Sequence, residues 1–96
     1  MEKELITLAR HKGCIVKNKE YYLWEIQLWL IKQHRFYISI DIIEAECWKQ
    51  WEGVLNPHDD DELSGMFLSD YLKREYFDSY EETLEQGLLA LMKLLP

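Results

Sequence analysis

The spacing of apolar and polar residues along the chain predicts a helix near each end. Residues 2–12 form one apolar face at helical spacing, and Gly13 follows as the C-terminal cap. Residues 79–95 repeat apolar side chains every three or four positions, and Ser79 with Glu82 forms a capping box at the start. The two apolar faces consist of Leu5, Ile6, Leu8 and Ala9, and of Tyr80, Leu84, Leu88, Leu91 and Leu95.

Residues 20–34 are dense in large apolar side chains, and their period is ambiguous. A helix would place Leu23, Ile26 and Leu30 on one stripe, whereas a strand would gather alternate residues from Tyr22 to Leu30. The stretch is longer than most strands and contains no turn residue, so a helix is favoured. Asn18 precedes it as a candidate N-cap.

The clearest strand signal lies in residues 35–44, where apolar and polar residues alternate. Its apolar face consists of Phe36, Ile38, Ile40 and Ile42. Residues 47–55 predict a second strand, antiparallel to the first because the connection between them is short. Gly53 in that strand indicates a bulge or a close backbone approach. Gly87 in the closing helix predicts close packing against the sheet, since glycine is otherwise unfavourable there.

The stretch from Asn56 to Phe77 is the hardest to interpret. Residues 56–65 form a loop, with Asn-Pro followed by acidic residues, serine and glycine. Residues 66–77 allow two interpretations: a helical turn built on their apolar residues, or a third strand over residues 72–77. We expect the strand. The chain is therefore predicted to be one α+β domain over residues 1–96. A small antiparallel sheet of two or three strands is packed by helices in the order α-α-β-β-(β)-α.

The net charge of −7, from 11 basic and 18 acidic residues, bears on the possible partners. It disfavours binding to nucleic acid or to an anionic membrane. No apolar run approaches the roughly 20 residues that span a bilayer, and the first residues lack a signal-peptide pattern. Cys14 and Cys47 have no close spacing and are predicted to be reduced thiols rather than a disulfide. These features predict a cytoplasmic protein that binds neither nucleic acid nor membrane.

Three segments of the chain resemble one family. Trp29-Leu30, His34 and the alternating residues from Phe36 to Ile40 are similar to its helix-to-strand junction. Residues 77–88 are similar to its C-terminal signature, F-x-S/T-Y-E-E-A-L-E-x-G-L, with Thr83 in place of alanine; residues 6–13 resemble its first helix. The family comprises short uncharacterised proteins of gut bacteria and their phages. The resemblance implies strands between a leading and a closing helix in a mobile-element setting, and it implies no activity and no site residue.

An acidic loop and the two cysteines are the candidate sites of chemistry in the sequence. The acidic loop from His58 to Glu62 has the oxygen ligands that Ca²⁺ or Mg²⁺ prefers, but it lacks the Asp-x-Asp-x-Asp-Gly spacing of a calcium loop. A solvated loop is the favoured interpretation. Neither Cys14, close to His11, nor Cys47 lies in a recognisable catalytic motif, and His34 fits a role at a helix end. We therefore predict no catalytic residue, no cofactor and no metal site.

The aromatic content is the remaining functional signal, with four Trp, six Tyr and three Phe in 96 residues. A thin core does not need all of these rings, so some are expected on the surface as a binding patch. The candidate interaction surface consists of Tyr21, Tyr22, Trp24, Trp29, Trp48 and Trp51. The sequence favours a small, non-enzymatic protein-interaction module of mobile-element or phage-related origin, with a protein partner or a weak homodimer. The alternative is a small metal-dependent factor or enzyme centred on the loop from His58 to Glu62.

Overall fold

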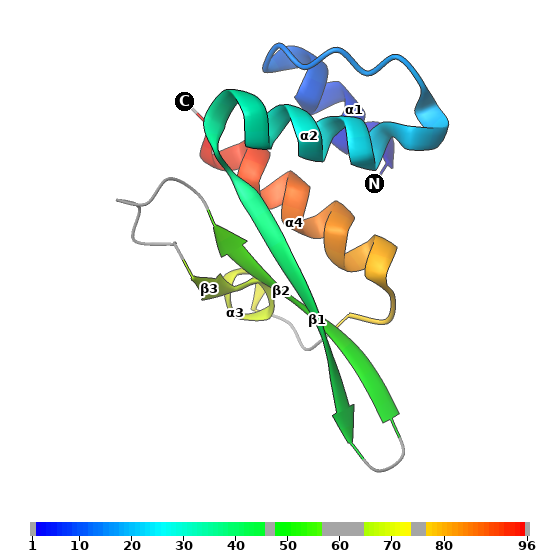
Figure 1. The fold of residues 1–96 in the computed structure, drawn as a ribbon, viewed down its shortest axis with the longest axis vertical. Helices are drawn as coiled ribbons and strands as arrows, with labels where there is room; N and C mark the ends of the chain where they lie inside the picture. Colours follow the sequence, from blue (N-terminus) through cyan, green and yellow to red (C-terminus); the bar gives the residue numbers. More distant parts are fainter. Residues whose placement is uncertain (1, 46–47, 57–64, 74–76, 96) are drawn as a thin grey trace.

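The computed structural model describes residues 2–45, 48–56, 65–73 and 77–95, and it confirms the α+β architecture (Figure 1). The helices are α1 (Glu2–His11), α2 (Tyr22–His34), α3 (Leu68–Leu72) and α4 (Tyr80–Leu94), with a short 3-10 helix η1 (Lys19–Tyr21) before α2. The strands are β1 (Tyr37–Ala45), β2 (Trp48–Asn56) and β3 (Met66–Phe67). The order is the predicted one, with α3 as an additional short helix.

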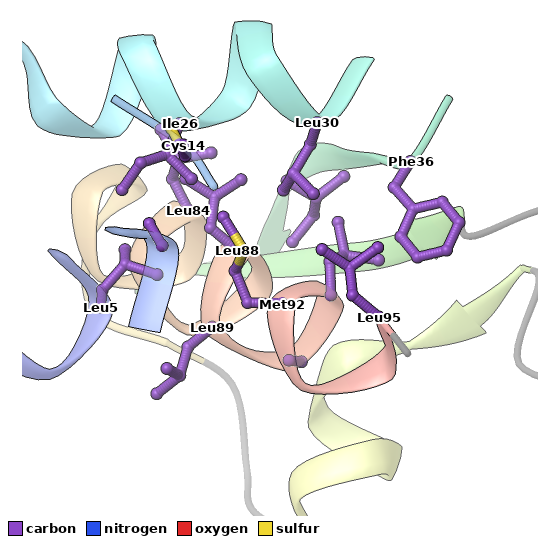
Figure 2. Close-up of a cluster of buried hydrophobic side chains, with 14 of the residues drawn as sticks. Leu5, Cys14, Ile26, Leu30, Phe36, Leu84, Leu88, Leu89, Met92 and Leu95 are labelled. Atoms are coloured by element: carbon purple, nitrogen blue, oxygen red, sulfur yellow. The ribbon is translucent and has the colours of Figure 1, made fainter. Parts of the chain in front are cut away.

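Helix α4 lies between two layers. Helices α1 and α2 pack on one side of it and the sheet packs on the other (Figure 1). Its buried residues therefore point in several directions rather than along one stripe: they are Thr83, Leu84, Gly87, Leu88, Leu89, Ala90, Leu91 and Met92. In Figure 2, Ile26 and Leu30 of α2 point toward Leu84 and Leu88 of α4, and Leu5 approaches from α1. The core of the protein is centred on α4.

The sheet has the strand order β1-β2-β3, so β1 forms one edge. Ile38 pairs with Leu55 and Ile42 with Trp51 in a regular antiparallel register. Ile38 is buried against the helices, as the alternation predicts, whereas Ile42 on the same face is 41% exposed. The far end of the β1–β2 hairpin extends away from the helices in Figure 1, and α4 does not cover this part of the sheet.

Two glycines allow α4 to approach the sheet closely. A Cβ atom at Gly87 would lie 1.7 Å from Ile38 Cδ1, and one at Gly53 would lie 2.8 Å from the same atom. Gly53 pairs with Ile40 without a break in register, so of its two predicted roles the close approach is confirmed and the bulge is not. The Ile38 side chain thus fills the space that both glycines leave open, as predicted for Gly87.

The predicted strand over residues 72–77 is misplaced. Within residues 66–77, the third strand lies at the start, in Met66–Phe67. Leu68–Leu72 forms α3, in agreement with the helical alternative. At the other end, Phe77 makes an isolated antiparallel bridge with Trp51. The reason is a long-range contact: the buried carboxylate of Glu52 on β2 accepts hydrogen bonds from the backbone N–H and the hydroxyl of Ser69, which attaches α3 to the sheet.

The predicted helix ends are confirmed. Gly13 has a φ of +103°, a conformation that glycine adopts without strain, at the end of α1. The Asn18 side chain accepts from the N–H of Glu20 and caps η1, which leads directly into α2. The Ser79 hydroxyl accepts from the N–H of Glu82 at 3.1 Å and caps α4.

Candidate functional site

Helix α2 is apolar on two opposite sides. Its inner side contributes Ile26 and Leu30, both fully buried against the core. Its opposite side contributes Tyr21, at the end of η1, with Trp24 and Ile31, which are 59%, 64% and 42% exposed. A surface helix of a globular protein normally has polar residues on its outer side. The exposed apolar side of α2 is therefore the feature of the described structure that calls for a functional explanation.

The segment before η1 adds to this apolar surface. Ile15 is 73% exposed, while its neighbours Cys14 and Val16 point into the core. Ile15, Trp24 and Leu28 line a shallow hollow of about 260 Å³. We call the surface formed by Ile15, Tyr21, Trp24, Leu28 and Ile31 the outer face of α2.

Hydrogen bonds from both neighbouring helices hold Ile15 beside α2. Glu25 of α2 accepts from the N–H of Lys17 at 2.9 Å through its Oε2 atom. From α1, the guanidinium of Arg10 donates to the carbonyl oxygen of Val16 at 3.1 Å. These two bonds anchor the peptide unit between Val16 and Lys17, just after Ile15, and before Ile15 the N–H of Cys14 donates to the carbonyl oxygen of Ala9 at 2.9 Å, so the hollow is present before any partner arrives.

The structure brings together three of the six aromatic residues predicted as an interaction surface, because Trp29 lines the same hollow as Trp24. Tyr21 and Trp24 both belong to the outer face of α2. Tyr22, Trp29 and Trp51 are only partly exposed and pack against the core. The side chain of Trp48 lies outside the described residues.

The three core-packed aromatics have specific partners. The Tyr22 hydroxyl donates to a carboxylate oxygen of Glu85 on α4. The Trp29 ring meets His34 edge-on at 4.8 Å, so His34 packs at the end of α2 as a ring partner. The Trp51 ring meets Tyr80 in a similar geometry at 5.7 Å. These contacts explain the positions of Tyr22 and Trp51 without a binding partner, whereas Trp29 also lines the hollow of the outer face.

Sequence reasoning that weighed only aromatic rings missed the aliphatic residues of the outer face, which are Ile15, Leu28 and Ile31. The sequence did contain a signal for Leu28 and Ile31. Tyr21, Trp24, Leu28 and Ile31 follow one another at intervals of three, four and three residues, which is the spacing of a coiled-coil seam.

The thiol considered for nucleophilic chemistry is poorly suited to it. Cys14 is a free, buried cysteine, and burial, with a smaller effect from the negative charge of Glu25, raises the pKa of its thiol. A raised pKa lowers the fraction of reactive thiolate, and burial limits access to it. His11 is exposed at the end of α1. Cys47 lies outside the described residues.

The loop from His58 to Glu62 also lies outside the described residues. In the described ranges, no group of three or more His, Cys, Asp or Glu side chains is placed to hold a metal ion. Nor does any helix in these ranges combine the length and the apolar character needed to cross a bilayer.

Charges are unevenly distributed between the two halves of the chain. Residues 1–35, which form α1, η1 and α2, contain seven basic and four acidic residues, whereas residues 36–96 contain four basic and fourteen acidic residues. Four exposed basic residues adjoin the outer face: Lys17 and Lys32 line its hollow, while Lys19 and Arg35 precede and follow its η1 and α2 residues along the chain. We call these four residues the basic rim. An apolar surface with a basic rim thus lies on a protein that is acidic as a whole.

Comparison with models of protein families, with curated proteins and with solved structures finds no match to this chain. The resemblance to short proteins of gut bacteria and phages therefore stays a prediction.

Proposed function

We propose that this chain is a small protein-interaction module and that its contact surface is the outer face of α2. The observation that carries the proposal is the exposure of Trp24 on a helix whose opposite side is fully buried in the core. Burying a large apolar side chain contributes about 1.5–3 kcal/mol. A partner that covers the outer face therefore gains several such contributions from a surface that is already ordered.

The clustering of these residues distinguishes this surface from ordinary apolar exposure. Tyr37, Ile42, Phe67 and Tyr80 are also exposed, but they are distributed over two strands, β1 and β3, and α4. Single exposed apolar residues are normal on soluble proteins, whereas a contiguous patch is typical of an interaction site. The outer face of α2 combines five apolar residues with a preformed hollow.

Binding without catalysis, a cytoplasmic location and a mobile-element or phage-related origin are parts of the same proposal. The last two are supported by composition and by the family resemblance alone. The alternative, a metal-dependent factor, depends on the loop from His58 to Glu62, which the structure does not describe. A Ca²⁺ or Mg²⁺ titration followed by NMR separates the two: saturable shifts confined to residues 58–62 at micromolar metal favour the alternative.

Site-specific photo-cross-linking in the native host tests the proposed surface. A photoreactive amino acid replaces Leu28 on the outer face or, as the control position, exposed Lys73 on the other side of the molecule. We expect discrete protein adducts from position 28 only. The double variant Trp24→Gln, Ile31→Gln should abolish them, because it removes apolar contact area and keeps good helix formers.

A matched variant separates loss of binding from loss of folding. Phe67→Thr removes an exposed ring from β3, 51% exposed, and should leave the adducts unchanged. Both variants should retain the free energy of unfolding of the wild type to within about 0.5 kcal/mol, as expected for surface substitutions. Equal adducts at positions 28 and 73, insensitive to the double variant, would refute the proposed surface.

A further inference from the structure

We infer that the partner presents an amphipathic helix with acidic flanks to the outer face of α2. This inference rests on the proposed function and specifies the chemistry of the partner. It combines three observations: the spacing of the apolar residues, the basic rim around them, and a second basic hollow next to the rim.

The spacing of the apolar residues indicates a helical partner. Tyr21, Trp24, Leu28 and Ile31 form a line that is about 15 Å long at the helical rise per residue. Side chains at such spacing form the ridges that pack into the grooves of another helix. The backbone hydrogen-bonding groups inside a helix are paired internally, so α2 offers none of the pairing that an extended strand would need.

The charges around the face select an acidic partner. All four members of the basic rim are exposed. Of the two acidic residues nearby, Glu25 accepts hydrogen bonds from the backbone N–H groups of Lys17 and Asn18, so its carboxylate is already engaged, and only Glu20 is fully exposed. The rim therefore has a net positive charge. Complementary charges at the edge of an interface accelerate association and exclude wrong partners.

The positive region continues beyond α2. A second hollow, of about 470 Å³, lies between α1 and η1, and Lys19 of the rim is one of its lining residues. Two further cations from α1, Lys3 and Arg10, line the same hollow. Its lining residues that the structure describes include no carboxylate. Acidic side chains on one flank of a bound helix thus find cations along both η1 and α1.

A second copy of the chain is a poorer occupant of this surface. In an antiparallel pair of outer faces, Lys17 and Lys19 of one copy approach Lys32 and Arg35 of the other. In a parallel pair, Lys32 and Arg35 approach their own counterparts. Both arrangements place the basic rims against each other, and like charges across an interface disfavour association.

Two designed helical peptides test the inference. Both carry the same leucine seam, and their flanking positions are all Glu in one peptide and all Lys in the other. Binding is followed by NMR through the indole N–H signal of Trp24, assigned with Trp24→Phe. We expect the Glu-flanked peptide to bind about tenfold more tightly near 0.1 M salt, with a preference that declines as salt screens the rim.

Charge-reversal variants connect the preference to the rim. Lys32→Glu should reduce the preference several-fold, whereas Lys73→Glu, an equal change of net charge at the exposed end of α3, should leave it intact. Equal affinity for both peptides would overturn the acidic partner and leave the proposed apolar surface standing. A Trp24 signal that neither peptide shifts would also overturn the inference, whether or not the signal responds to anionic vesicles. Sedimentation that shows a dimer dissociated by Trp24→Gln would overturn it in favour of a second copy.

Discussion

Replacing Gly87 by alanine tests how closely α4 packs against the sheet. In an exposed helix, Gly→Ala stabilises by about 1 kcal/mol through helix propensity. Here the new Cβ atom would lie 1.7 Å from Ile38 Cδ1, far inside van der Waals contact. Ile38 cannot simply rotate away, because it is buried and its Cδ1 atom also fills the space above Gly53. Overpacking of this kind costs about 1–3 kcal/mol, so after subtraction of the propensity gain we expect a net destabilisation of up to about 2 kcal/mol.

A double-mutant cycle with Ile38→Val isolates the steric term. Valine lacks the Cδ1 atom, and the next contact of the new Cβ is Ile38 Cγ1 at 3.0 Å, which small shifts can relieve. Ile38→Val alone should cost about 0.5–1.5 kcal/mol. In that background, Gly87→Ala should be neutral or slightly stabilising, which gives a coupling energy of about 1–2 kcal/mol. Urea unfolding followed by far-UV circular dichroism measures each free energy. If Gly87→Ala stabilised the wild type by the full propensity gain, with no coupling to position 38, the close approach would be refuted.

Two further predictions concern buried polar groups. Glu52→Gln should destabilise the protein by about 1–3 kcal/mol, because an amide cannot accept all the hydrogen bonds that the carboxylate receives from Gly53 and Ser69. Faster amide hydrogen exchange at Ser69 would show that α3 detaches from the sheet first. Unchanged exchange would contradict the role of Glu52 in attaching α3. The Cys14 thiol has a raised pKa, so the stability it contributes is complete below its ordinary pKa near 9 and declines as the pH rises through the raised value. In a Cys47→Ser background, iodoacetamide should modify Cys14 much more slowly in the native protein than in urea; equal rates would contradict its burial.

Elements defined by local sequence were predicted well. The capping signals at Asn18 and Ser79 act over a few residues, and the structure confirms both. The alternation in β1 and the short connection after it define an antiparallel hairpin in the same local way. The stretch from Met66 to Phe77 could not be predicted correctly, because its conformation depends on Glu52 and Trp51, which belong to a strand distant in sequence.

The candidate surface shows where reasoning from the sequence reached its limit. The sequence by itself determined that residues 20–34 are apolar beyond the needs of one helical face, and that more rings are present than a thin core requires. The stripe of Leu23, Ile26 and Leu30 was visible in it, but because the opposite side is apolar as well, the sequence could not determine whether that side is covered too. Tertiary packing decided this: α4 covers Ile26 and Leu30, and Trp24 on the opposite side remains exposed. The physical reason is that the hydrophobic effect is non-directional, so burial of either apolar side would stabilise the fold. The shape of the neighbouring helix α4 therefore selects the side that is buried.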